Sequence, residues 1–191
     1  MPESKRTVDI FGAVLLIIVF LPIAVLVTCA VCLSSSGPVI FSQERVGYRG
    51  KSFTIYKFRT LRKDSGKRGT DFVFAGDPRV TKVGRFLRST RLDELPQLWN
   101  VLCGEMSLVG PRPVSLLNLP ALSTNIPRYC ERFAVKPGLT GLASIRANEK
   151  SLEGIRRAIR LDLFYIRRRC FLFDLWILTH TVSIVLSRKG V

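Results

Sequence analysis

The stretch from Ile10 to Leu33 constrains this chain more than any other feature, because it holds 24 consecutive uncharged and mostly apolar residues. As a straight helix it would be about 36 Å long, and the hydrocarbon core of a bilayer is about 30 Å thick. We therefore expect the segment to hold the chain in a membrane. The rest of the 191 residues suffices for one compact domain.

Two features bear on how this segment enters the membrane. Pro22 lies in its middle, where proline removes a backbone hydrogen bond and favours a kink. Lys5 and Arg6 precede the segment and further basic residues follow it, so the positive-inside rule assigns both ends to the cytoplasm. A re-entrant hairpin satisfies both features, and a kinked spanning helix is the alternative that the residues alone leave open. A cleaved signal peptide fits less well, because the apolar run is too long.

Basic residues dominate the charge of the chain. Thirty Lys and Arg residues oppose 14 Asp and Glu residues, which gives a net charge of +16. Such a charge implies an anionic partner, which can be nucleic acid, an anionic leaflet or a phosphorylated substrate.

The five cysteines include a CxxC pair, Cys29 and Cys32, inside the apolar segment. We interpret this pair as small hydrophobic residues, and the odd count argues against a disulfide framework.

Turn residues and apolar periodicity predict the elements that follow the apolar segment. Short strands are expected at 39–41 and 53–60, around a turn at 47–50. The polar run at 63–70 predicts a loop. The glycines and proline of residues 136–141 predict a rigid turn.

Two short helices are predicted between Asp77 and Asn100. In the second, Asp93 is expected to be the N-cap, and Pro96 would lie in the first turn, where a missing N–H costs nothing.

The C-terminal part predicts helices that lie on an anionic membrane surface. Basic and apolar residues interleave from Glu149 to Arg169, and the next stretch, Phe171 to Leu186, is apolar apart from Asp174, His180 and hydroxyl residues. A second transmembrane span is the alternative, but the stretch is short and Asp174 would be costly in lipid. We assign His180 to packing.

Asp93 and Glu94 are the strongest candidates for catalysis. Adjacent acids at a helix start are most simply explained as a cap. Four arginines lie nearby in the sequence, namely Arg85, Arg88, Arg91 and Arg112, and the last stands between two prolines that stiffen its backbone. Carboxylates beside arginines suit phosphoryl chemistry, because one acid can attack phosphorus or bind Mg²⁺ while guanidinium groups neutralise charge.

Longer strings of the chain resemble the monotopic phosphoglycosyl transferases of the bacterial sugar transferase family, which load a sugar phosphate onto a polyprenyl phosphate. The strings are KRTVDI, GPVIFSQERVGYRGKSFTIYKFRT, DPRVTKVGRFLRSTRLDELPQLWNVLCGEMSLVGPRP, RFAVKPGLTG and LDLFYIRRRCFLFDLWILTHTV. They cover nearly the whole chain. The resemblance implies that Asp93 is a covalent nucleophile, that Glu94 is its partner associated with Mg²⁺, and that the membrane segment is a re-entrant anchor bent at Pro22.

One stretch departs from the family pattern. After KPGLTG, members often continue with QVSGR or QVNGR, whereas this chain continues with Ser144, Ile145, Arg146, Ala147 and Asn148. The difference bears on recognition of the sugar or nucleotide, since the Asp-Glu pair itself is intact.

The resemblance predicts an α+β protein with three parts. Residues 1–36 would form the re-entrant helix-break-helix, residues 37–149 a small and mainly helical catalytic domain with short strands, and residues 150–191 the amphipathic interfacial helices and C-terminal tail. The protein would transfer a sugar-1-phosphate from a UDP-sugar to undecaprenyl phosphate and release UMP through an aspartyl-phosphosugar intermediate. It would act on the cytoplasmic face of the bacterial inner membrane, in the first membrane step of polysaccharide or glycan assembly.

Six cations are assigned to phosphate and substrate binding, and Asp93 and Glu94 to Mg²⁺. The cations are Lys57, Arg59, Arg88, Arg91, Arg112 and Lys136. The expected partners are both substrates and membrane lipids, with a second copy of the chain and downstream glycosyltransferases as further candidates and no nucleic acid. Two rival hypotheses are a membrane-tethered binder of nucleic acid or anionic lipid, and an inactive relative that serves as a scaffold.

Overall fold

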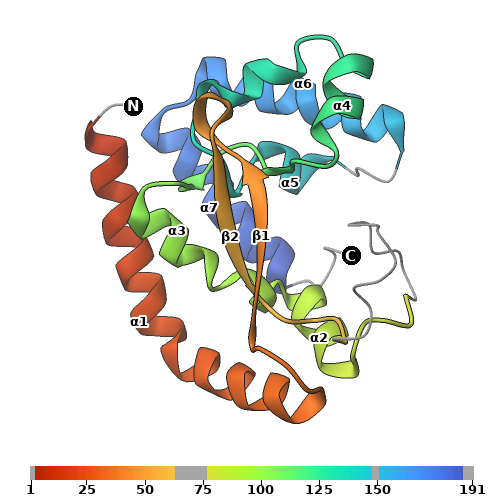
Figure 1. Ribbon diagram of the computed structural model, residues 1–191. Coiled ribbons are helices and arrows are strands. Elements are labelled where there is room, and N and C mark those ends of the chain that lie inside the picture. The colour runs from red at the N-terminus through yellow and green to blue at the C-terminus, as the bar shows by residue number, and fades with distance from the viewer. Residues whose placement is uncertain (1–2, 63–76, 148–150, 187–191) are drawn as a thin grey trace.

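The computed structural model describes residues 3–62, 77–147 and 151–186, and it combines helices with short strands (Figure 1). The helices are α1 (Glu3–Ser34), α2 (Lys82–Thr90), α3 (Gln97–Cys103), α4 (Leu119–Asn125), α5 (Leu142–Arg146), α6 (Leu152–Arg168) and α7 (Phe171–Leu186). The strands are β1 (Ile40–Val46), β2 (Ser52–Phe58), β3 (Ser107–Val109), β4 (Val114–Ser115) and β5 (Gly138–Thr140). The 3₁₀ turns are η1 (Tyr48–Gly50), η3 (Leu92–Glu94) and η4 (Tyr129–Ala134). The loop predicted at 63–70 lies outside the described residues.

The predicted strands form an antiparallel hairpin around η1. β1 and β2 pair in register from Ile40 opposite Phe58 to Val46 opposite Ser52. The first strand is therefore longer than the predicted 39–41, because every residue up to Val46 finds a partner in β2. β4 joins the other edge of β1 to give the order β2-β1-β4, and β3 and β5 form a separate parallel pair. β2 is thus an edge strand whose outer backbone groups must be satisfied by another element.

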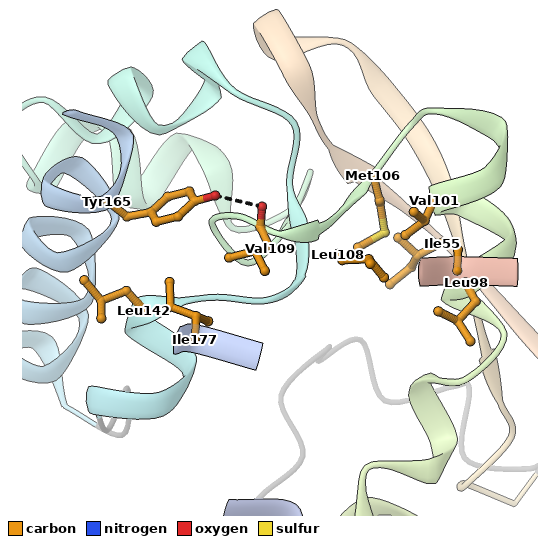
Figure 2. Packing of buried hydrophobic residues seen from close by; sticks show 10 residues of the cluster. Ile55, Leu98, Val101, Met106, Leu108, Val109, Leu142, Tyr165 and Ile177 are labelled. Carbon is orange, nitrogen blue, oxygen red and sulfur yellow. Dashed lines mark hydrogen bonds between the residues drawn. The ribbon is translucent and has the colours of Figure 1, made fainter. Parts of the chain in front are cut away.

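One apolar cluster joins the helices to the strands (Figure 2). Its buried members are Ala13, Ile55, Leu98, Val101, Met106, Leu108, Val109, Leu142, Tyr165 and Ile177. The Tyr165 hydroxyl of α6 donates to the carbonyl oxygen of Val109 in β3 at 3.1 Å. This hydrogen bond gives the buried phenol a partner and fixes α6 against the β3 segment.

α1 remains helical through Pro22, and Figure 1 shows that it changes direction in its middle part. A proline inside a helix explains a bend without a break. Ala13 packs into the main cluster, whereas Val27 and Val31 pack with Phe58 and Leu87 in a second one. Both halves of α1 therefore contact the rest of the protein along one face.

The opposite face of α1 carries large exposed apolar side chains. Phe11, Ile18 and Leu26 are 72%, 65% and 70% exposed. Among the described helices, α1 is the one that is long and apolar enough to cross a membrane. Exposed side chains of this kind are costly in water, so they support membrane association.

Polar residues at the start of α1 dock it onto three other elements. Arg6 donates to the carbonyl oxygens of Val101 and Leu102 at 2.5 and 2.6 Å, where α3 ends. Asp9 accepts from the Leu108 N–H at 3.0 Å, and the Lys5 ammonium lies 2.5 Å from a carboxylate oxygen of Asp174 in α7.

Helices are confirmed in the C-terminal part. α6 buries Ala158, Ile159, Asp162 and Tyr165 on one face and exposes its arginines on the other. Asp174 in α7 accepts from the Tyr165 hydroxyl at 2.7 Å in addition to its ion pair with Lys5. These partners explain an acid in an apolar helix without a second membrane span. The interfacial location of both helices and the domain boundaries at residues 36 and 149 stay predictions.

Half of the predicted turn at 136–141 is instead strand β5, because Gly138 and Thr140 pair in parallel with β3. A Cβ atom added at Gly138 would lie 2.0 Å from the Gly110 nitrogen and 2.4 Å from the Thr140 oxygen. The glycine is therefore required by close backbone approach and not by a turn conformation.

We expect Gly138→Ala to lower the free energy of unfolding by about 3 kcal/mol, because backbone atoms on two sides would have to move. Denaturant unfolding in detergent measures the loss. The control is Gly50→Ala, where φ is +75° but no atom lies within 4 Å of an added Cβ. Its conformational cost should be about 1 kcal/mol, and equal losses at the two sites would contradict the steric explanation.

Candidate active site

Asp93 and Glu94 lie in the short 3₁₀ turn η3 between α2 and α3, and not in the first turn of an α-helix. Arg91 ends α2 in the left-handed region at φ +57°, and η3 follows directly. The N–H groups of Glu94, Leu95, Leu98 and Trp99 then donate to carbonyl oxygens three residues earlier. α3 begins only at Gln97, after Pro96.

The prediction that Asp93 is the N-cap and that Pro96 lies within the helix is therefore wrong. The N–H groups of Glu94 and Leu95 close a separate 3₁₀ turn by donating to Arg91 and Leu92, and the α-helix starts only after that turn. No hydrogen bond to the Asp93 carboxylate is found among the described residues, and this residue is only 8% exposed. Asp93 is thus buried but does not cap a helix. A carboxylate that is left free to react is expected to have these two properties.

Glu94 is held by two cations from distant parts of the chain. The Lys57 ammonium of β2 lies 2.7 Å from Oε1 of Glu94, and Nη2 of Arg112 lies 2.8 Å from the same oxygen. The prolines on either side of Arg112 restrict its backbone. The fold therefore brings together Asp93, Glu94, Lys57 and Arg112.

The two adjacent acids have opposite pKa shifts. Burial alone would raise the pKa of Glu94, but Arg112 and Lys57 outweigh it and hold that pKa below its usual range. Burial and the neighbouring Glu94 charge raise the pKa of Asp93 to about 6. Glu94 is therefore firmly ionised, whereas Asp93 is a more basic carboxylate and hence a better nucleophile at neutral pH.

Arg88 and Arg91 add positive charge around the same acids. Nε of Arg88 donates to Thr60 at 3.0 Å, and its charge, after that of Lys57, favours ionisation of Asp93. Nη2 of Arg91 lies 3.5 Å from the carbonyl oxygen of Ser144. The stretch that departs from the family pattern is thus in contact with the turn that carries the acids.

Arg59 and Lys136 lie apart from this cluster. The Arg59 guanidinium donates to the carbonyl oxygens of Ser35 and Val31 at 2.6 and 3.4 Å, and to that of Pro38, where α1 ends. The Lys136 ammonium lies beside Arg6 and Gly104 at the C-terminal end of α3, whereas the acids precede the N-terminal end.

We expect Arg59→Met to lower the free energy of unfolding by about 2 kcal/mol, because carbonyl groups at the end of α1 lose their donors. The KM for the nucleotide substrate should stay within about twofold of the wild-type value, since this guanidinium does not face the acids. Steady-state kinetics and denaturant unfolding measure both effects. Lys57→Met is the contrasting variant, and it should lose activity. A raised KM in Arg59→Met would instead show that Arg59 contributes to substrate binding.

Two buried amides near the site were missed from the sequence. Nδ2 of Asn100 donates to the Thr54 carbonyl oxygen at 2.6 Å, and its Oδ1 accepts from the Tyr56 N–H at 3.4 Å. Asn100 thus satisfies the edge of β2 on both sides of Ile55, in the part of the strand that leads directly to Lys57. Nε2 of Gln97 is buried and has no hydrogen-bond partner among the described residues. Neither residue shows a sequence signal, because an amide on an apolar helix face reveals its partner only in the fold.

The residues present fit Mg²⁺. No group of three or more His, Cys, Asp and Glu side chains comes together within the described ranges. Mg²⁺ does not need such a group, because it commonly takes one or two carboxylates together with substrate phosphates and water. The Asp93 carboxylate gives up no hydrogen bond to residues 3–62, 77–147 and 151–186 when it binds the ion, and both cations contact Oε1 of Glu94.

Comparisons with known proteins show the family of this chain. A family model described as "Bacterial sugar transferase" matches residues 2–188. A UDP-glucose:undecaprenyl-phosphate glucose-1-phosphate transferase of Caulobacter vibrioides is 43% identical over 190 residues, which cover 96% of this chain and 70% of that protein. A UDP-N-acetylgalactosamine-undecaprenyl-phosphate N-acetylgalactosaminephosphotransferase of Aeromonas hydrophila is 38% identical over 97% of this chain, which spans 44% of that protein.

A third relative is closer in length to this chain. The sugar transferase EpsL of Bacillus subtilis, described as uncharacterized, is 39% identical over 98% of this chain and 89% of its own length.

Proposed function

Because this chain belongs to the bacterial sugar transferase family, we propose that it transfers a sugar-1-phosphate from a UDP-sugar to undecaprenyl phosphate through a covalent intermediate on Asp93. The observation that carries the proposal is a buried aspartate whose carboxylate has no hydrogen bond within the described part of the chain, next to a glutamate that two cations hold ionised. A group that only stabilised the fold would be expected to use its hydrogen-bonding capacity. The relatives named above differ in their sugars, so the proposal leaves the sugar open.

In the first step, a carboxylate oxygen of Asp93 attacks the β-phosphorus of the UDP-sugar. A bond forms between this oxygen and phosphorus, and the bond from phosphorus to the oxygen bridging the two phosphates breaks. UMP leaves with that bonding pair, and the sugar phosphate remains on Asp93 as an acyl phosphate. The raised pKa of Asp93 favours this role, because a more basic carboxylate is the better nucleophile.

The surrounding residues stabilise the charge that develops on the phosphates. Lys57, Arg88, Arg91 and Arg112 surround the acids, and Glu94 orients two of these cations. When bound, Mg²⁺ would be held by Asp93 and Glu94 and would neutralise charge on the diphosphate. Preorganised cations of this kind act strongly where water is largely excluded.

In the second step, an oxygen of polyprenyl phosphate attacks the same phosphorus. The acyl phosphate bond breaks, the Asp93 carboxylate is restored, and the product is a polyprenyl diphosphate sugar. Two displacements let a water-soluble donor and a lipid acceptor use one site in turn. An acceptor confined to the bilayer requires that this site lie at the membrane surface.

The packing of α1 supports a hairpin-like insertion over a span. The first half contacts α3 and β3, and the second half contacts α2 and β2. If α1 crossed the bilayer, these elements would enter the hydrocarbon with Arg88 and Glu94, at a large desolvation cost. A bent helix that enters one leaflet keeps both ends and the catalytic residues on one side. We assign that side to the cytoplasmic face of the inner membrane, where the basic residues that flank α1 favour it.

Isotope exchange tests the covalent mechanism. Purified protein is incubated with an unlabelled UDP-sugar, Mg²⁺ and labelled UMP in the absence of polyprenyl phosphate. A covalent intermediate predicts that label enters the UDP-sugar, because the first step is reversible without the acceptor. Label that enters only after polyprenyl phosphate is added would instead show direct transfer in a ternary complex. A panel of UDP-sugars in this assay would also identify the donor.

Thiol labelling tests the topology. Single cysteines at Ser4 and Ser36, in a background without the native cysteines, are treated with a membrane-impermeant reagent from either side. We expect both positions to react from the cytoplasmic side alone. Labelling of the two positions from opposite sides would show a span. Self-association and contacts with downstream glycosyltransferases stay predictions.

A further inference from the structure

We propose that Arg132 is a positioning residue for Arg112, which it orients from behind without contacting substrate. The inference rests on the proposed function, because it concerns the arginine assigned to the substrate phosphates. Arg132 lies in η4, and its side chain is 7% exposed. Arg132 therefore acts through its contacts with other residues of the protein.

The Arg132 guanidinium is held from two directions. Nη2 lies 2.6 Å from Oδ2 of Asp162 in α6, and Nη1 donates to the Tyr129 hydroxyl at 3.0 Å. The guanidinium also stacks over the Tyr129 ring, 5.2 Å from its centroid. The Asp162 side chain is only 2% exposed, so the ion pair is almost completely removed from water.

The same guanidinium reaches the backbone of the substrate arginine. Nη2 of Arg132 donates to the carbonyl oxygen of Arg112 at 3.0 Å. The preceding carbonyl, that of Pro111, accepts from the Gly138 N–H at 2.9 Å. Two successive peptide groups are thus fixed from η4 and β5, while the Arg112 side chain extends to Glu94 at 2.8 Å.

A purely stabilising role accounts poorly for this arrangement. A buried ion pair is often no more stabilising than an apolar pair of the same volume, because both charges lose their hydration. The guanidinium does supply direction, since its rigid fork can hold Asp162, Tyr129 and the Arg112 carbonyl at once. An ammonium group at this position has the charge but lacks the planar fork.

The test is a double-mutant cycle between Arg132 and Arg112, with the UDP-sugar as varied substrate. We expect Arg132→Lys to lower kcat/KM by about tenfold to a hundredfold, because a small displacement of a positioned group has an effect of this size. In an Arg112→Ala background the same substitution should have no further effect, since it acts through Arg112. A residue that only stabilised the fold would lower Tm and have the same effect on kcat/KM in both backgrounds. Arg128→Lys, in the exposed pair with Glu131 next to η4, is the matched control and should change nothing.

A second measurement does not depend on turnover. The Nε–H resonance of Arg112 in labelled protein should shift in Arg132→Lys and not in Arg128→Lys. If the wild-type protein transfers no sugar but this resonance responds, the proposed function fails and the positioning role stands. If the protein is active and the cycle is additive, the positioning role is wrong. Should Arg132→Lys not fold, Tyr129→Phe removes one partner of Arg132 and should give a smaller, non-additive loss of about threefold.

Discussion

Asp93→Asn is expected to lower turnover by at least about 10⁴-fold, because the amide cannot form the acyl phosphate. The loss should appear equally in UMP release with acceptor and in isotope exchange without acceptor, since both require the first step. Mass spectrometry of the wild-type protein, quenched after mixing with a UDP-sugar, should find the sugar phosphate on the peptide that contains Asp93. The same peptide from the variant should carry no adduct.

The stability of this variant distinguishes lost chemistry from lost folding. The pKa of Asp93 rises from its ordinary value of 3.8 to about 6 in the folded protein. At neutral pH the folded state therefore disfavours this ionised carboxylate relative to the unfolded state. A neutral Asn removes that cost, so Tm should be equal to or higher than that of the wild type. Glu44→Gln, an exposed change of one charge on β1, is the control, and normal turnover in Asp93→Asn would refute the nucleophile assignment.

Glu94→Gln is expected to lower kcat by about 10³-fold through three effects of one substitution. Lys57 and Arg112 lose the carboxylate that orients them, and the site loses a candidate Mg²⁺ ligand. The variant also lacks the negative charge that helps to raise the pKa of Asp93. When activity is titrated with magnesium, the variant should need a higher Mg²⁺ concentration than the wild type to reach half of its maximal activity.

The pH profile separates these effects. Activity should fall as the pH drops through the pKa of Asp93, because only the ionised carboxylate attacks phosphorus. Removing the Glu94 charge lowers that pKa, so the acid limb of the Glu94→Gln profile should move to lower pH. An unchanged limb together with unchanged kcat would mean that Glu94 is not coupled to the nucleophile. Glu94→Asp should recover part of the activity.

Local patterns in the sequence predicted the elements well and their contacts poorly. The strand pair, the two helices around the acids and the C-terminal helices all follow from turn residues and apolar periodicity. Glu94, Lys57 and Arg112 were assigned to one site from motifs, and the fold brings them together. The reason is that each motif fixes its own backbone, while the β-hairpin and the β3–β5 pair set the distances between motifs.

The structure differs from the sequence-based expectations at three residues. The sequence predicts Asp93 as an N-cap because a helix is expected to begin there. In the structure the left-handed Arg91 ends α2 and a 3₁₀ turn follows, and this conformation has no local signature in the sequence. Arg59 lies two residues beyond Lys57, and nothing in the local sequence distinguishes it from an arginine that binds phosphate. Its guanidinium instead donates to a carbonyl group at the end of α1. Lys136 lies in a matching motif but at the far end of α3. For both cations the partner is distant in sequence, so no local pattern identifies it.

The contact of Arg59 with the end of α1 connects the active site to the thickness of the bilayer. An apolar helix adjusts its tilt when lipid chains lengthen or shorten. Here the Ser35 carbonyl oxygen, directly after α1, accepts from Arg59, which follows β2 directly, and Lys57 near the end of β2 contacts Glu94. Tilt of α1 would therefore move Lys57 relative to Glu94. Turnover in bilayers of graded acyl-chain length should pass through an optimum. That optimum should broaden in Arg59→Met, because this substitution removes the hydrogen bonds that connect the end of β2 to the end of α1.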